Sequence, residues 1–432
     1  MKHTPSEKEL LEKAARYLSA STAGNFNPDP ERPFVIKEGK GSRVWDVGGK
    51  EYIDYLMGSG PVVLGHAHPA VVAAVVETVE KGSTFFATNE KAVLLAEEIV
   101  NAIPCAEKVR FTTSGTDACF QCLRIARSFR KRDKVLKFEG GYHGTSDYAF
   151  MSVTPGLNDL RDFPEPVAHS AGVPRAIHDS VLMAPYNDIE TSTAIIDKYH
   201  DELAAVIVEP IQRLLPPKPG FLQALREATA HYQIPLVFDE VVTAFRLAYS
   251  GGQEYYGVTP DLAALGKIVG GGYALGAVAG REEIMSVLDP ALADSDSFVP
   301  QIGTLNGNPV ACAAGLATLA ELRKEGTYER LYATGRRLRD ALERLCREAE
   351  IPMQPAGVDP LFGFYFSEEP LSDYRSTLAA DPAMMKRFNE LLLEQGVLKA
   401  WPDKFYPSLA HTEEDIDRTI AIFGSVIERL GH

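Results

Sequence analysis

The sequence predicts an α/β protein, with a large domain built on a mostly parallel sheet covered by helices and a smaller α+β domain. Short apolar runs alternate with helical patterns between about residues 105 and 280, which is typical of parallel strands joined by crossover helices. After about residue 320 the pattern changes to long charged helices around one short apolar run. With 432 residues, 45% of them hydrophobic, the chain is long enough for two or three domains.

These changes of pattern set the expected domain boundaries. Residues 1–65 form an N-terminal segment whose strands are too few to fold alone, so we expect it to pack on the smaller domain. Residues 66–320 form the large domain, and residues 321–432 form the C-terminal small domain.

Each expected element rests on a local pattern. In the N-terminal segment we expect two short strands, at 34–37 and 43–46. In the large domain five apolar runs predict strands, at 108–112, 135–138, 204–208, 235–238 and 276–279, and helical spacing predicts a helix at 115–130. In the small domain we expect two helices and a strand, at 328–349, 383–395 and 362–366.

Charge and cysteine content limit the partners and the compartment. The net charge of −15 argues against nucleic acid or an anionic membrane as the main partner. Five cysteines, an odd number in a long chain, do not form a disulfide framework and indicate a reducing compartment. The first residues lack the apolar stretch of a signal peptide, and residues 56–76, although uncharged, contain prolines and glycines that do not suit a membrane span. We therefore expect a cytoplasmic protein.

Lys267 is the only charged residue between Leu262 and Gly280. Burial disfavours the ammonium form and lowers the pKa of such a lysine. A neutral amine is what Schiff-base chemistry requires. The alternative is a core lysine whose amine reaches solvent.

Asp239 ends an apolar run at the expected carboxyl edge of the sheet, where α/β proteins bind ligands, and Glu209 ends another. Either acid alone could simply cap a helix. An acid and a lysine from neighbouring strand ends suggest instead a cationic ring nitrogen held by the aspartate and an aldehyde held by the lysine.

Two further segments complete a pocket. The run from Thr112 to Thr116 places hydroxyls and backbone N–H groups at the start of a helix, which suits a phosphate, although Ser and Thr are also common N-caps. The run from Gly140 to Gly144 brings Tyr142 to the same edge, although it could be a turn with a packed tyrosine. Phosphate cradle, aromatic ring, carboxylate and lysine together describe a site for pyridoxal 5′-phosphate.

The motifs themselves resemble those of a known family. The runs 239–246 and 266–272, together with 114–116, 141–144 and 303–309, resemble the class III aminotransferases of pyridoxal-phosphate fold type I. The similarity extends from about residue 33 to 416, and within the family it is greatest to glutamate semialdehyde aminomutase. It implies a large pyridoxal-phosphate-binding domain and a small domain built from both chain ends.

The resemblance implies a role for each matching position. Lys267 is the Schiff-base lysine and moves the proton, and Asp239 pairs with the ring nitrogen. The remaining positions hold the rest of the cofactor: Ser114, Gly115 and Thr116 at the phosphate, Val241 and Tyr142 on the two ring faces, and Glu209 and Gln212 beside the ring hydroxyl. Thr304 matches a threonine that reaches the phosphate of the partner subunit, which implies a homodimer with shared active sites.

Departures from the family pattern bear on the reaction. The carboxylate-binding arginine segment of the aminomutase is replaced by residues 21–28, and its tryptophan falls at Ser59. No arginine occurs between 388 and 417, so Arg213 and Arg246 are the remaining candidates to bind a substrate carboxylate, with Ser59 and Gln212 beside the substrate.

These departures favour a transaminase that works in ping-pong order between an amine or amino acid and an aldehyde, ketone or oxo acid. The alternatives are an intramolecular aminomutase of the glutamate semialdehyde type and a non-catalytic binding protein, which would lack the lysine or the aspartate. No metal site is expected, because neither the pair Cys119 and Cys122 nor the pair His66 and His68 has a further ligand in view.

Overall fold

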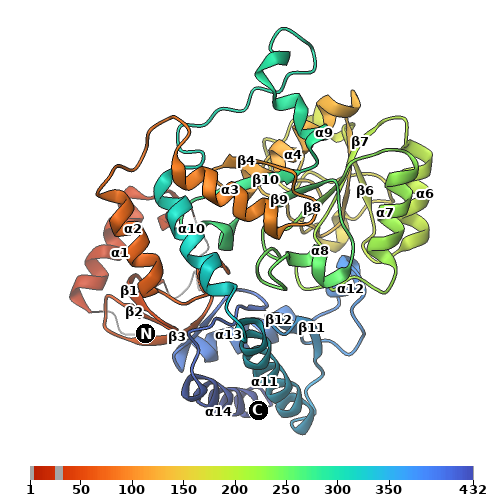
Figure 1. Cartoon of the computed structure of the whole chain (residues 1–432). Helices are drawn as coiled ribbons and strands as arrows, with labels where there is room; N and C mark the ends of the chain where they lie inside the picture. Colours follow the sequence, from red (N-terminus) through yellow and green to blue (C-terminus); the bar gives the residue numbers. More distant parts are fainter. Residues whose placement is uncertain (1–3, 25–32, 432) are drawn as a thin grey trace. The chain divides into compact units, whose positions relative to one another are not determined.

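The computed structural model describes residues 4–24 and 33–431, and the chain divides into two compact units (Figure 1). The first unit combines residues from the start of the chain up to 69 with 326–370 and with residues from 380 onward. The second unit contains 70–325 and 371–379. Within the described residues, no helix has both the length and the apolar character needed to cross a membrane.

The second unit is built on a seven-stranded sheet of order β4-β10-β9-β8-β7-β5-β6. The strands are β4 (Lys108–Thr112), β5 (Lys134–Phe138), β6 (Val181–Ala184), β7 (Leu203–Val208), β8 (Leu236–Asp239), β9 (Leu262–Leu265) and β10 (Gly276–Gly280). Neighbours from β9 to β6 pair in parallel, whereas β10 is antiparallel to both β9 and β4. Every residue of β7, β8 and β9 is buried, as expected for strands covered on both faces.

Helices cover both faces of this sheet (Figure 1). Residues of α4 (Gly115–Arg130) pack on one face, and residues of α6 (Ile189–Tyr199) and α7 (Phe221–His231) pack on the other. The other helices of the unit are α2 (Pro69–Val79), α3 (Glu90–Ala102), α5 (Arg175–His178), α8 (Gly251–Tyr256), α9 (Glu282–Met285), α10 (Pro309–Leu322) and α12 (Tyr374–Thr377).

The first unit contains two small sheets. Strands β1 (Ile36–Lys40), β2 (Arg43–Asp46) and β3 (Glu51–Tyr55) form one of them, and β13 (Val397–Lys399) pairs in parallel with β3. The other has the order β11 (Gln354–Val358), β12 (Leu361–Tyr365), β14 (Lys404–Phe405). The helices are α1 (Pro5–Tyr17), α11 (Thr327–Glu348), α13 (Pro382–Glu394) and α14 (Glu413–Leu430).

The aromatic core of this unit explains why its elements hold together. Phe364 of β12 and Phe388 of α13 meet edge to face at 5.1 Å, and Phe405 of β14 packs edge to face on Phe423 of α14 at 5.8 Å. Strand β13, from near the end of the chain, completes the sheet formed by the first strands of the chain.

Candidate active site

Lys267 lies two residues after the end of β9, beyond Gly266, and opens a single 3₁₀ turn, Lys267–Gly270. Its backbone has a φ of +51°, a left-handed conformation that costs a non-glycine residue roughly 1 kcal/mol or more. Burial lowers the pKa of its amine, the carboxylate of Asp239 opposes that shift, and the guanidinium of Arg213 adds to it. No hydrogen bond to this amine is found among the residues that the structure describes. The strained turn therefore carries an amine that has a lowered pKa and no hydrogen-bond partner among the described residues.

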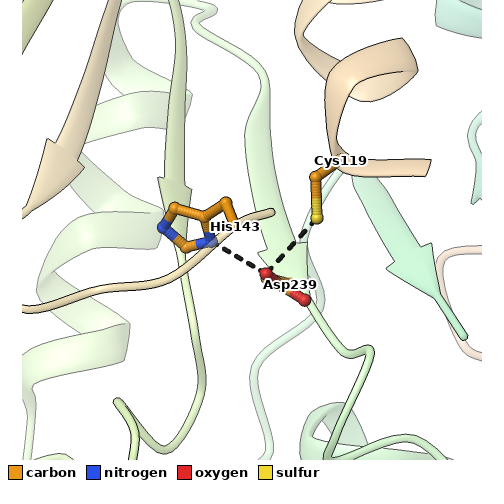
Figure 2. A group of neighbouring side chains, drawn as sticks. All are labelled: Cys119, His143 and Asp239. Carbon is orange, nitrogen blue, oxygen red and sulfur yellow. Dashed lines mark hydrogen bonds and ion pairs between the residues drawn. The ribbon is translucent and has the colours of Figure 1, made fainter. Parts of the chain in front are cut away.

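Asp239 is the last residue of β8, and its register partner on β9 is Ala264, three residues before Lys267. Figure 2 shows two side chains converging on its carboxylate. The Nδ1 atom of His143 lies 2.8 Å from Oδ2, and the thiol of Cys119 donates to the same oxygen at 3.3 Å. The other oxygen, Oδ1, accepts from the backbone N–H of Val241 at 3.1 Å. The carboxylate is thus fixed in orientation.

Cys119 and His143 are the functional contacts that the sequence did not predict. Cys119 lies in a helical apolar pattern, where a cysteine is indistinguishable from any small hydrophobic residue. His143 stands next to Tyr142 in the glycine-rich run, and its position after a predicted strand was the available signal. The buried Nε2 atom of His143 has no partner among the described residues.

The same three side chains carry ligand atoms within 4.8 Å of one another, which is close enough for a metal ion. Burial and the neighbouring Asp239 raise the pKa of the Cys119 thiol well above its ordinary value, which favours the protonated thiol that donates to the Asp239 carboxylate. Hydrogen bonds to one carboxylate account for the cluster.

The predicted phosphate-binding residues form the N-terminus of α4. The hydroxyl of Ser114 caps the helix by accepting from the backbone N–H of Asp117 at 3.1 Å. A Cβ atom on Gly115 would lie 2.6 Å from Val241 Cγ1, so only glycine lets the helix start so close to the strand end. The helix dipole and the free N–H groups of this 16-residue helix favour an anion.

Tyr142 is held beside Glu209 and Arg213. Its backbone N–H donates to Glu209 Oε2 at 3.1 Å, and the Arg213 guanidinium lies 5.4 Å from the centre of its ring. Gln212 donates from Nε2 to the carbonyl of Glu139 at 2.7 Å, while its buried Oε1 has no partner among the described residues. These residues thus meet at the carboxyl edge of the sheet.

Two predicted site residues lie elsewhere. Thr304 is exposed and lines an open cavity of about 470 Å³ together with Phe85 and Phe86. Ser59 is exposed in the first unit, at a φ of +68°. The replaced segment 21–28 falls partly outside the described residues.

The residues that do meet fit pyridoxal phosphate by their chemistry. Lys267 offers an amine for the aldehyde, and Oδ1 of Asp239 has a lone pair left for a ring N–H after accepting from Val241. Gln212 leaves a buried acceptor unpaired, and the start of α4 offers N–H groups for the phosphate. An acceptor, a reactive amine and an anion site within one sheet edge match the parts of this cofactor.

Comparison with known proteins agrees with this chemistry. The chain matches the family model described as aminotransferase class-III over residues 26–427. An omega-transaminase from Sphaerobacter thermophilus is 34% identical, with a TM-score of 0.92 and 98% of each chain covered. A solved transaminase with PLP bound is 29% identical, with a TM-score of 0.90, over 100% of this chain and 99% of that chain.

A glutamate-1-semialdehyde aminomutase from Pseudomonas aeruginosa PAO1 has a TM-score of 0.87 over 99% of this chain and 95% of that chain. At 24% identity it shows the shared fold alone. These likenesses confirm the predicted fold class, a pyridoxal-phosphate enzyme of fold type I.

Proposed function

The chain belongs to the class III aminotransferase family, and we propose that it moves an amino group from an amine or amino acid to an aldehyde, ketone or oxo acid in ping-pong order. Its cofactor is pyridoxal 5′-phosphate, as in the similar transaminase with PLP bound. The observation that carries the proposal is the position of Lys267 and Asp239 at the ends of neighbouring strands, where the Asp239 carboxylate also acts on the pKa of the Lys267 amine.

In this proposal each side chain has one task at the cofactor. Lys267 holds the aldehyde carbon covalently, and Asp239 holds a proton on the ring nitrogen. The remaining residues bind and orient: Ser114, Gly115 and Thr116 at the phosphate, Val241 and Tyr142 on the two ring faces, and Glu209 and Gln212 at the ring hydroxyl.

When bound, pyridoxal phosphate supplies the aldehyde that receives the amino group and a ring that withdraws electrons from the carbon losing a proton. Lys267 would hold the aldehyde carbon, and its amine, once free, would accept the proton from the substrate carbon and hold it for return within the site. A lowered pKa suits this task, because the free amine must accept a proton near neutral pH. Asp239, fixed in orientation by the Val241 N–H and by its contact with His143, would hold the positive charge on the ring.

The alternative is an intramolecular aminomutase. Two features support transfer between molecules: Ser59 stands where the aminomutase has its tryptophan, and the similar structures at 34% and 29% identity are both described as transaminases. The aminomutase must retain its substrate through two half-reactions, whereas a transaminase releases its first product.

Arg213 is the proposed partner of a substrate carboxylate. Its charge is close enough to lower the pKa of the Lys267 amine, so a carboxylate on it would lie near the reacting carbon. The chain has no arginine between 388 and 417 to bind a second carboxylate, and a buried carboxylate without a partner costs several kcal/mol. We therefore expect monocarboxylate amino acids and simple amines to be better donors than glutamate.

The test is a donor panel measured as single half-reactions. Holoenzyme is mixed with a primary aryl amine, alanine, glutamate or glutamate semialdehyde, and conversion of the cofactor from its aldehyde to its amine form is followed by absorbance. The proposal predicts conversion by the amine or by alanine that is faster than with glutamate. Isomerisation of glutamate semialdehyde with no half-reaction from any simple amine would establish the aminomutase instead.

We further propose a cytoplasmic homodimer in which Thr304 serves the partner's site. Large apolar side chains support this, because Phe85 and Phe86 line the same cavity as Thr304 while remaining 53% and 68% exposed, and Ile302 is 79% exposed. Mass measurement in solution should give twice 47.2 kDa or a multiple of that value. A fully active monomer would refute the shared site.

A further inference from the structure

Lys137 is a second buried lysine near the proposed site, and it lies on β5. Its side chain is 0% exposed. Its ammonium donates to the backbone carbonyls of Gly141 at 3.1 Å, Ala149 at 2.8 Å and Met151 at 2.5 Å. No carboxylate is bonded to it in the described part of the chain. An ammonium has three hydrogen-bond donors, and each of them is paired with one of these carbonyls.

The three carbonyls lie at both ends of one segment, residues 140–152, here called the Tyr142 loop. The N–H of Gly140 also donates to the carbonyl of Ser152 at 2.9 Å, which closes the base of the loop. Lys137 therefore joins both the start and the end of the Tyr142 loop to β5, the strand that precedes the loop.

The Tyr142 loop touches three of the residues proposed to hold the cofactor. The N–H of Tyr142 donates to Glu209, and His143 bonds to Asp239. Gly144 packs directly on Thr116: a Cβ atom there would lie 2.6 Å from the Thr116 hydroxyl oxygen. The path of this loop therefore affects three positions proposed to hold the cofactor: the Tyr142 ring, the Asp239 carboxylate and Thr116.

We propose that Lys137 is a positioning residue for the cofactor, which ties the two ends of the Tyr142 loop to β5 and so fixes Tyr142 and His143 in the site. The inference rests on the proposed function of this site and goes beyond it, because the Lys137 amine bonds to carbonyls of the loop and not to a residue proposed to hold the cofactor. It acts through the loop alone.

The surroundings of Lys137 explain why a lysine performs this role. Burial lowers the pKa of its amine to about 7, and the negative charge of Glu209 opposes that shift. A methionine would avoid the cost of burying charge, but it would leave three carbonyls without a donor. Compared with a methionine, a lysine at position 137 therefore supplies the hydrogen bonds that fix the Tyr142 loop.

The chain offers a matched control in the other unit. Lys399 on β13 is also buried, burial also lowers its pKa to about 7, and it donates to backbone carbonyls, those of Pro402 at 2.6 Å and Ala400 at 3.4 Å. It has none of the loop contacts described above. Lys137→Met and Lys399→Met therefore remove the same kind of group from two different places.

The experiment titrates apoprotein with pyridoxal phosphate and measures the dissociation constant, the visible circular dichroism of the bound cofactor and the thermal unfolding of the apoprotein. We expect Lys137→Met to raise the dissociation constant at least tenfold and to change the dichroism. Lys399→Met should lower the unfolding temperature and leave the dissociation constant within twofold of wild type. Equal loss of stability in both variants with unchanged cofactor affinity in both would overturn the proposal.

A second variant keeps the test decisive if Lys137→Met does not fold. Lys137→Gln retains two donors on a shorter side chain, and we expect a weaker but measurable loss of affinity, whereas wild-type affinity would overturn the proposal. Lys267→Ala, titrated in parallel, separates a failure of this inference from a failure of the proposed function. If that variant still attached the cofactor covalently, the proposed function would fail whatever Lys137→Met did.

Discussion

Lys137 and Lys267 occupy two regions of the same unit, one near the end of β5 and the other in the turn after β9. The two amines differ in their hydrogen bonding. Burial lowers the pKa of both amines. The Lys137 amine donates hydrogen bonds to three carbonyls, whereas no acceptor for Lys267 is found in the described part of the chain. A lowered pKa alone therefore does not identify a reactive lysine.

The charges around the two lysines also differ. The carboxylate of Glu209 acts on the pKa of both amines, but the amine of Lys267 also experiences the carboxylate of Asp239 and the guanidinium of Arg213. An amine without fixed hydrogen bonds can move between two bonding partners, but an amine with three acceptors cannot move without breaking them. Freedom to move distinguishes the reactive lysine from the positioning one.

The largest effect is expected where the mobile amine is removed altogether. Lys267→Ala should lower the transamination rate by about 10³-fold or more, because both covalent attachment and proton transfer are lost. The free energy of unfolding of its apoprotein should stay within about 0.5 kcal/mol of wild type, since no hydrogen bond is removed. Lys137→Ala should instead cost about 2 kcal/mol or more, because buried carbonyls lose their donor. Denaturant unfolding of the two apoproteins measures this contrast, and equal losses of stability would break it.

The next effect concerns the carboxylate beside Lys267. Asp239→Asn keeps the shape but removes the charge that holds a proton on the ring, so the half-reaction should slow by about 10²- to 10³-fold while the cofactor remains attached. Cys119→Ala removes one neutral donor from Oδ2 and should slow it only about tenfold or less. Rapid-mixing absorbance measures both rates. If the Asp239→Asn variant reacted nearly as fast as wild type, the carboxylate would have no part in the chemistry.

The smallest effect tests the cation beside Lys267. Arg213→Met removes a positive charge, so the pKa of the Lys267 amine should rise and less of it should be neutral at pH 7. The pH profile for cofactor attachment to the apoprotein should therefore shift to higher pH. Arg213→Lys keeps the charge and should leave the profile in place. A shift to lower pH in the methionine variant would contradict the assigned electrostatics.

The sequence predicted the parts of the fold that have a periodic signal. The helix predicted at 115–130 has the same bounds as α4, and the strand predicted at 108–112 has the same bounds as β4. The other four strands predicted in the large domain begin and end within one residue of β5, β7, β8 and β10. Strands β6 and β9, each four residues long, were missed. Strand β9 also lies inside the long apolar run around Lys267, where no turn signal separates it.

The site was predictable where one residue stands out from its neighbours. Lys267 and Asp239 are charges in apolar surroundings, and a short sequence window reveals them. The contacts of Lys137 could not be found in this way, since its acceptors lie up to 14 residues away in a loop without periodicity. The bond from Cys119 to Asp239 spans 120 residues and depends on how α4 packs on the sheet.

Chemical trapping of the cofactor distinguishes the two lysines. Holoenzyme is reduced with borohydride, which makes a bond between the cofactor and a lysine permanent, and the digested protein is mapped by mass spectrometry. We predict one labelled lysine per chain, Lys267, with Lys137 unlabelled in the same digest. Label on Lys137 or on another lysine, or no label on a holoenzyme that transaminates, would contradict the assignment of Lys267 as the reactive amine.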